Sequence, residues 1–209
     1  MKLLSFIRLG KSSFGAVVNG GVIDLTGKLD PDVNSIKDLI SLNMEDQAQE
    51  YIEGKTKDLS FSDITFLPVI PDPQKIMCIG LNYMEHKKET GRPDVDNPTI
   101  FTRFADSQVA HMQPMIKPDK SDRFDYEAEM AIIIGKGGRF ISEDEALSHI
   151  AGYACYNDGS IRNYQRHTSQ YTPGKTFPGT GGFGPYMVTP DEVGDYTKLP
   201  IELRLNGNV

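Results

Sequence analysis

The stretch DYEAEMAIIIG, residues 125–135, has the composition of a β-strand and is the strongest strand signal in the chain. On a strand, alternate side chains share one face, so Glu127 and Glu129 point the same way as the apolar Ala131 and Ile133. Two like charges on a half-apolar face are costly unless a cation lies between them. A solvated strand end, with the apolar face beginning only after Glu129, explains this stretch alone equally well.

A third carboxylate favours the cation. The apolar segment 152–157 is predicted to be a strand that ends in a turn, and this places Asp158 at the strand's end. Two glutamates and an aspartate on strand positions would form an all-oxygen site suited to Mg²⁺, Mn²⁺ or Ca²⁺. No histidine lies at a spacing that would indicate zinc.

Beyond Asp158, Arg162 and Gln165 are three residues apart and share one helical face if the turn continues into a helix. An arginine on that face could clamp a carboxylate of a ligand. Without Asp158 nearby, a plain exposed helix would be the better interpretation.

The first 70 residues are predicted to form a small α+β domain. Strands are expected over 5–9, 14–18 and 22–25, with a tight hairpin turn at Asn19–Gly20. Ser35 can cap a helix, and a second helical stretch covers 44–51. Three prolines at 68, 71 and 73 then form an extended connector, so a domain boundary is placed there, between domains 1–70 and 71–209.

The second domain is expected to be mostly β. The predicted elements are strands at 75–79, 100–104 and 201–205, a helix-compatible segment at 83–91, and a helix that opens with a capping box at Ser142–Glu145 and ends at Gly152. Asn206–Gly207 is a strong hairpin turn whose returning strand is cut off at Val209, which predicts that the natural protein continues.

Composition excludes several classes. The net charge is −7 and no basic run is present, so general nucleic-acid binding is disfavoured. No apolar run approaches the roughly 20 residues of a membrane-spanning helix. The two cysteines, Cys78 and Cys155, form neither a zinc pattern nor a disulfide framework, and the N-terminus is better interpreted as a strand than as a signal peptide. A cytoplasmic protein is therefore predicted.

Several ordered motifs resemble one family. Over roughly residues 75–207 the chain is similar to the fumarylacetoacetate hydrolase superfamily, through the strings Gly80–Glu89, Asp125–Gly135, Ala151–Gln165 and Gly174–Phe177. The resemblance implies a mixed β-roll behind a smaller N-terminal domain, an α+β and mostly β fold, and homodimers. It also implies an enzyme that acts on a small 2-oxo or β-diketo acid.

The same resemblance assigns roles to individual residues. It implies a divalent metal, Mg²⁺ or else Mn²⁺ or Ca²⁺, and a dyad of His86 and Glu89 that activates water. Without the resemblance, His86 would be interpreted as an exposed histidine near two lysines, because most polar residues lie on the surface. Arg103, where many members have Lys, and Pro178, where many have Asp, depart from the pattern and blur the substrate assignment. The implied residues are Glu127, Glu129 and Asp158 for the metal, Tyr83, Arg162 and Gln165 for the substrate, and His86, Glu89 and Lys175 for catalysis.

The expected function is metal-dependent hydrolysis of a C–C bond in a fumarylacetoacetate- or acylpyruvate-like acid. His86, held by Glu89, would deprotonate water, while Lys175 and Arg162 would neutralise negative charge. The alternatives are a 2-oxo acid decarboxylase, or an isomerase or hydratase, of the same superfamily. A non-catalytic binding domain or an inactive fragment is the alternative from a different class.

Overall fold

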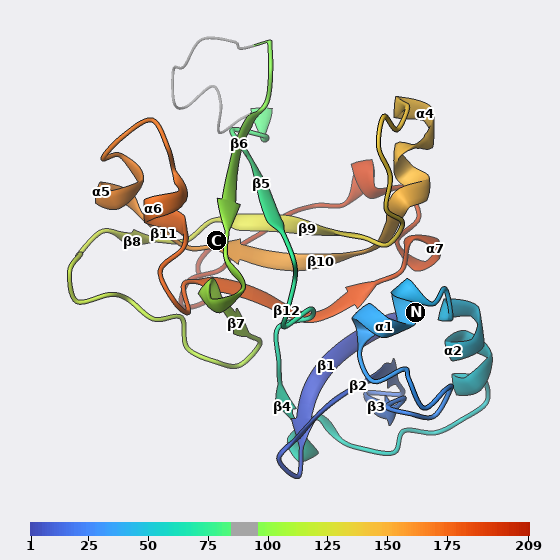
Figure 1. The fold of residues 1–209 in the computed structure, drawn as a ribbon. Helices are drawn as coiled ribbons and strands as arrows, with labels where there is room; N and C mark the ends of the chain where they lie inside the picture. The colour runs from blue at the N-terminus through green and yellow to red at the C-terminus, as the bar shows by residue number, and fades with distance from the viewer. Residues whose placement is uncertain (85–95) are drawn as a thin grey trace.

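The protein is described by a computed structural model that covers residues 1–84 and 96–209. Its centre is an eight-stranded sheet with the order β3-β2-β1-β12-β10-β9, in which β4 also pairs with β1 and β7 with β12 (Figure 1). These strands are β1 (Lys2–Arg8), β2 (Lys11–Val18), β3 (Gly21–Asp24), β4 (Thr65–Phe66), β7 (Gln108–Ala110), β9 (Ala128–Ile134), β10 (Ile150–Asp158) and β12 (Gly181–Val188).

Two short strand pairs and several helices complete the described part of the chain. The pairs are β5 (Ile76–Gly80) with β6 (Thr99–Arg103), and β8 (Phe124–Asp125) with β11 (Ser160–Ile161). The α-helices are α1 (Ile36–Ser41), α2 (Glu45–Ile52), α4 (Glu143–Ala146), α5 (Arg162–Gln165), α6 (Thr172–Lys175) and α7 (Pro190–Val193). The expected α+β class, with mostly β structure, is confirmed.

The hairpin turn and the first helix of the N-terminal segment lie where the sequence predicted them. Asn19 and Gly20 take φ values of +49° and +70°, the two left-handed positions of the tight turn between β2 and β3. The Ser35 hydroxyl accepts a hydrogen bond from the Asp38 amide at 3.0 Å and caps α1. The hairpin and the first helix therefore follow from residues close together in sequence.

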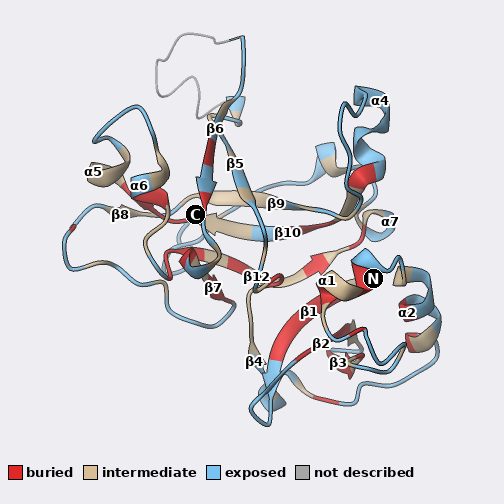
Figure 2. Ribbon diagram, viewed as in Figure 1, coloured by how far each residue is buried: buried red, intermediate tan, exposed pale blue. Residues whose placement is uncertain are grey.

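A separate N-terminal domain is not shown. β1 pairs antiparallel with β12, with Lys2 opposite Val188, so the first strands continue the sheet that carries β10 and β9. One buried core spans both segments, as the buried stretches of β1 and β12 in Figure 2 show. Its members include Leu3, Phe14, Leu39, Ala154, Phe183 and Met187.

The strand predicted over 125–134 is interrupted in the structure. β8 ends at Asp125 and β9 begins at Ala128, so Glu127 lies in the break between them. The reason lies on the neighbouring strand, because the Glu127 amide donates to Asn157 Oδ1 at 3.1 Å and its carbonyl accepts from the Asp158 amide at 3.0 Å. These bonds fix Glu127 beside the end of β10.

The helix after Ser142 is shorter than expected. α4 continues only as a 3-10 turn through His149, and β10 begins at Ile150. Gly152 is therefore inside a strand and is not a helix cap. A Cβ at this position would lie 2.8 Å from the Val188 carbonyl oxygen, so the close approach of β12 requires the glycine.

At the C-terminal end, the predicted turn is present and the predicted strand is not. Asn206 and Gly207 have φ values of +53° and +84°, and Leu205 forms an isolated bridge with Asn208. Residues 201–204 form no strand. A strand needs a neighbour for its backbone groups, and this segment gains one only at Leu205. Continuation of the natural chain beyond Val209 stays a prediction.

Among the described residues, every helix is too short or too polar to cross a lipid bilayer.

Candidate functional site

A group of charged side chains meets where β10 ends and β9 begins. Three carboxylates, from Glu127, Glu129 and Asp158, are called the acidic cluster here. Three cations surround it from other elements: Arg103 at the end of β6, Arg162 at the start of α5 and Lys175 at the end of α6. Residues far apart in sequence thus converge at one end of the sheet.

Lys175 joins two of the carboxylates. Its Nζ lies 2.7 Å from Glu127 Oε2 and 2.5 Å from Asp158 Oδ2, and the residue is only 1% exposed. A buried ammonium must be paired to be tolerated, and here two carboxylates share it. The resemblance implied a catalytic Lys175 beside the substrate, and this role stays a prediction.

Arg103 holds the other oxygen of Asp158. Its Nη1 lies 2.6 Å from Asp158 Oδ1, while Nη2 donates to Thr180 Oγ1 at 2.9 Å and Nε to Ser107 Oγ at 3.2 Å. Sequence reasoning treated Arg103 only as a departure from a family pattern. The signal that could have identified it is its position two residues after Phe101, on the same face of β6, where a buried unpaired charge would not be tolerated.

Arg162 connects the acidic cluster to a fourth carboxylate. Its Nη1 lies 2.6 Å from Glu127 Oε1, and its Nη2 lies 2.6 Å from Asp125 Oδ2. Nη1 also donates to Gln165 Oε1 at 3.1 Å, so Arg162 and Gln165 share one face of α5 as expected. Asp125 was not among the predicted site residues, although it stands two positions before Glu127.

The two glutamates experience opposite environments. Burial raises the pKa of Glu129 to about 7, and a hydrogen bond from Tyr83 only partly offsets that effect, while the charge of Glu127 adds to it. Burial also acts to raise the pKa of Glu127, but Lys175 and Arg162 outweigh it and lower that pKa. Tyr83, a predicted substrate residue, therefore contacts Glu129, the glutamate whose pKa is raised.

The predicted metal ligands fit a hard cation in chemistry but are not gathered around one point. Carboxylate oxygens are what Mg²⁺ prefers, yet residues 1–84 and 96–209 contain no group of three His, Cys, Asp or Glu side chains arranged to hold a metal ion. Glu127 and Asp158 are directed to Lys175 instead. Metal binding by Glu127, Glu129 and Asp158 stays a prediction.

The predicted catalytic dyad cannot be placed. His86 and Glu89 lie outside the described residues, as does most of the helix-compatible segment 83–91. Their role as water activators therefore stays a prediction.

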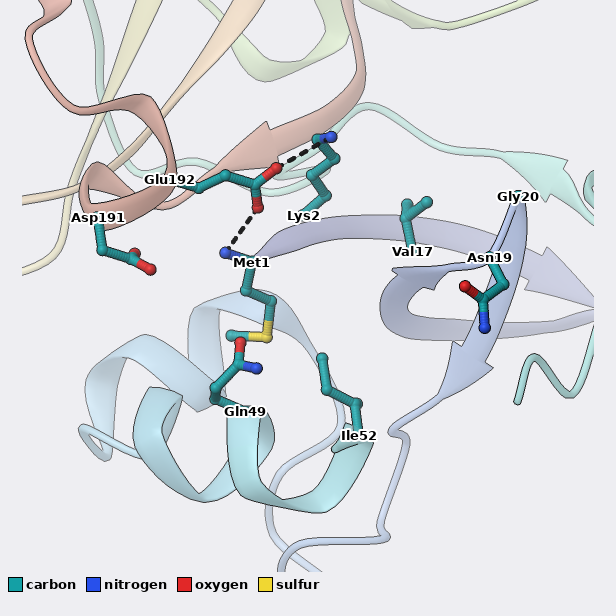
Figure 3. A pocket seen from close by; sticks show the side chains of 9 residues that line it. All are labelled: Met1, Lys2, Val17, Asn19, Gly20, Gln49, Ile52, Asp191 and Glu192. Carbon is teal, nitrogen blue, oxygen red and sulfur yellow. Dashed lines mark ion pairs between the residues drawn. The ribbon is translucent and has the colours of Figure 1, made fainter. Parts of the chain in front are cut away.

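One hollow of the described surface lies at the start of β1, away from the acidic cluster. It has a volume of about 610 Å³ and contains no predicted site residue (Figure 3). Its cations already have a partner, because the Met1 amine and Lys2 Nζ lie 2.8 Å and 2.9 Å from the two oxygens of Glu192. Its lining residues are Met1, Lys2, Val17, Asn19, Gly20, Gln49, Ile52, Asp191 and Glu192.

The chain is similar in sequence to known proteins. The chain is 38% identical over 164 residues to the mitochondrial oxaloacetate tautomerase fahd2 of Xenopus laevis, covering 78% of this chain and 51% of that protein. It is 39% identical over 164 residues to human mitochondrial oxaloacetate tautomerase FAHD2A, covering 78% and 52%. The chain thus spans about half the length of the curated relatives it matches.

A solved structure is similar as well. The fumarylacetoacetate hydrolase (EaFAH) from Exiguobacterium antarcticum superposes with a TM-score of 0.72 at 29% identity, covering 91% of this chain and 67% of that one. Residues 75–209 match the family described as Fumarylacetoacetate (FAA) hydrolase C-terminal. This match includes more than half of the chain and every predicted site residue, and the chain therefore belongs to the fumarylacetoacetate hydrolase family.

Proposed function

We propose that this chain is the catalytic part of an isomerase that interconverts the keto and enol forms of a small 2-oxo acid such as oxaloacetate. The observation that carries the proposal is the cluster of Glu127, Asp158, Lys175 and Arg162 in a chain whose curated relatives include proteins named oxaloacetate tautomerases. The sequence alone favoured C–C hydrolysis and kept isomerisation as an alternative. The relatives support that alternative better.

The proposed reaction moves protons and leaves the carbon chain intact. A proton leaves carbon 3 of the keto acid, and another is added to the 2-oxygen, so negative charge develops on that oxygen in between. Preorganised cations lower the free energy of such a charge. Lys175 can supply a positive charge for the 2-oxygen. Its ammonium has three N–H groups, and because Glu127 and Asp158 accept from two of them, the third is left for the substrate.

A second cation can hold the acid itself. Arg162 and Glu127 keep about a fifth of their side-chain surface exposed, at 21% each, whereas Lys175 and Arg103 are buried. The accessible face of the site therefore presents Arg162 with Gln165. Asp125, Glu127 and Gln165 accept from four of the five N–H groups of Arg162. The remaining Nη2 N–H, together with the Gln165 amide, is therefore the proposed contact for the substrate carboxylate.

A divalent ion, Mg²⁺ first, is part of the proposal. Glu127, Glu129 and Asp158 would hold it, and it would supply positive charge near the 2-oxo and carboxylate oxygens of the substrate. The whole protein is further proposed to be a homodimer that takes a small-molecule acid and binds neither nucleic acid nor membrane. A cytoplasmic location stays a prediction.

The proposal is tested by mixing the full chain with the enol form of oxaloacetate in the presence of Mg²⁺ and following the loss of enol absorbance. Pyruvate formation is measured in parallel to detect decarboxylation, and an acylpyruvate is supplied to detect C–C cleavage. We expect faster tautomerisation with the wild type, and a loss of roughly 100-fold or more in Lys175→Met, on the scale of removing one charge-stabilising donor. Arg139→Ala, at an exposed arginine outside the acidic cluster, is the control and should keep full activity.

Each alternative outcome has a meaning. Cleavage of the acylpyruvate without tautomerisation would replace the proposal with the hydrolase hypothesis, and loss of cleavage in His86→Ala would then support the predicted dyad. Pyruvate formation would indicate a decarboxylase. Absence of all three activities would leave the non-catalytic alternative.

A further inference from the structure

A second hollow of the described surface is lined by three arginines. It has a volume of about 400 Å³, within the range of roughly 300–1,000 Å³ that is usual for ligand sites. Its lining residues are Arg123, Phe124, Asp125, Arg162 and Arg166. Phe124 is the single apolar side chain among them, which disfavours an apolar ligand.

The backbone brings these arginines together from two segments. β8 pairs antiparallel with β11, with Phe124 opposite Ile161, and the Arg162 amide donates to the Arg123 carbonyl at 2.9 Å. Arg166 directly follows α5, which begins at Arg162. Arg123 directly precedes β8, while Arg162 directly follows β11, so the pairing of the two strands brings the two segments that carry the three arginines together.

The charges of this hollow do not balance. Asp125 is its one carboxylate, and Arg162 binds it through Nε at 2.7 Å and Nη2 at 2.6 Å. Arg123 and Arg166 are exposed, and within residues 1–84 and 96–209 neither has a carboxylate within ion-pair distance. Two positive charges are therefore left for a ligand.

The larger hollow provides the contrast. There, the Met1 amine and Lys2 share Glu192, and Asp191 adds a further negative charge. Size alone would favour that hollow as a ligand site, but its cations are already occupied. The smaller hollow is the one in which cations lack partners.

We propose that the hollow between β8 and α5 binds a small oxyanion with two negative charges, either inorganic phosphate or a short dicarboxylate. The guanidinium groups of Arg123 and Arg166 contact its oxygens, since the planar fork of N–H groups matches both carboxylate and phosphate. Arg162 is held by Asp125 and Glu127 and supports one wall of the site. The hollow shares Arg162 with the proposed substrate contact, but anion binding by Arg123 and Arg166 needs neither a metal nor turnover, so it is tested separately from the proposed isomerase activity.

The experiment titrates the full chain, without divalent metal, with inorganic phosphate, succinate and acetate in separate calorimetric runs at low ionic strength. Amide and guanidinium NMR signals are followed in parallel. We expect saturable binding of at least one dianion, with shifts at the Arg123 and Arg166 Nε–H signals and about tenfold weaker binding of acetate. The paired substitution Arg123→Ala with Arg166→Ala should weaken the dianion about tenfold or more, and Arg→Lys at both positions should restore part of the loss.

Arg139→Ala is the matched control, because Arg139 is also exposed but stacks on Phe140 at 4.6 Å and lies outside the hollow. Unchanged binding in that variant supports the proposal. An equal loss in Arg139→Ala and in the paired variant would mean general charge attraction and would overturn it. Absence of saturable binding by both dianions, or binding that the paired variant leaves unchanged, would overturn it as well. Phosphate binding without succinate binding identifies a phosphate site, and the reverse a dicarboxylate site.

Discussion

Two ion-pair networks in this molecule have similar distances and different surroundings. At the acidic cluster, Asp158 has a cation on each oxygen, with Arg103 at 2.6 Å and Lys175 at 2.5 Å, and all three side chains are at most 6% exposed. At the chain start, Lys2 and Glu192 lie 2.9 Å apart, but their side chains are 38% and 37% exposed. Distance therefore does not predict the contribution to stability, because water can replace a lost partner only in the second network.

The largest effect is expected at Asp158. Asp158→Ala would leave Arg103 and Lys175 buried with one carboxylate fewer, and we expect a loss of about 3–5 kcal/mol in the free energy of unfolding. Urea unfolding followed by circular dichroism measures it. Asp122→Ala is the control, since Asp122 pairs with Lys117 at 3.1 Å but is fully exposed, and its removal should leave the stability essentially unchanged. Equal losses in both variants would remove the distinction between the networks.

Lys175→Met is expected to have the next largest effect. Glu127 keeps Arg162 and Asp158 keeps Arg103, so we expect a loss of about 2 kcal/mol, below that of a fully orphaned buried charge. Mn²⁺ should raise the melting temperature of this variant more than that of the wild type, because the ammonium no longer competes for the two carboxylates. A smaller Mn²⁺ effect in the variant than in the wild type would contradict the predicted cation site.

Arg103→Lys tests whether geometry matters inside the buried network. Lysine keeps the charge but cannot reach Asp158, Thr180 and Ser107 with one planar group. We expect a loss of about 1–2 kcal/mol, on the order of one or two hydrogen bonds. Thermal unfolding measures it, and wild-type stability in this variant would show that charge alone is sufficient.

The smallest effect is expected at Glu192. Hydrogen bonds from the terminal amine and Lys2, outweighing burial, hold the pKa of Glu192 below its ordinary value of 4.5. Its stabilisation is therefore present above that value and is lost as the pH falls through the folded-state pKa. Glu192→Gln should cost less than about 1 kcal/mol near neutral pH, and the stability curves of variant and wild type should converge in acid.

High salt provides the second measurement for this network. The difference between wild type and Glu192→Gln should shrink in about 1 M NaCl, whereas the difference at Asp158 should persist, because salt screens exposed charges far more than buried ones. A Glu192 difference that survives high salt would place both networks in the same class.

The sequence predicted best what neighbouring residues determine. Three local features each depend on residues no more than four positions apart, and the structure contains all three. They are the hairpin turn at Asn19–Gly20, the helix cap at Ser35 and the shared helical face of Arg162 and Gln165. The interruption before β9 was not predictable in this way, since it depends on the side chain of Asn157, 30 residues away. The shared sheet was missed for the same reason, because no local pattern pairs β1 with β12.

The candidate site shows the same division. Carboxylates on adjacent strand ends indicated Glu127 and Asp158, whereas Arg103 and Asp125 became visible only when distant segments met. A motif resemblance indicates which residues recur in a family. It does not indicate which carboxylate oxygen each cationic side chain contacts.

The pairing of β1 with β12 also has a consequence for biosynthesis. The Met1 amine donates to Thr189, 188 residues later, and β12 pairs with β1 at Lys2 and Leu3, so this part of the strand edge stays uncovered until β12 has been synthesised. Contacts of such long sequence separation slow folding, and an uncovered strand edge is where nascent chains associate wrongly. We therefore expect the β12-facing edge of β1 to be covered only at Phe6 and Ile7, by β4, until synthesis has passed residue 188.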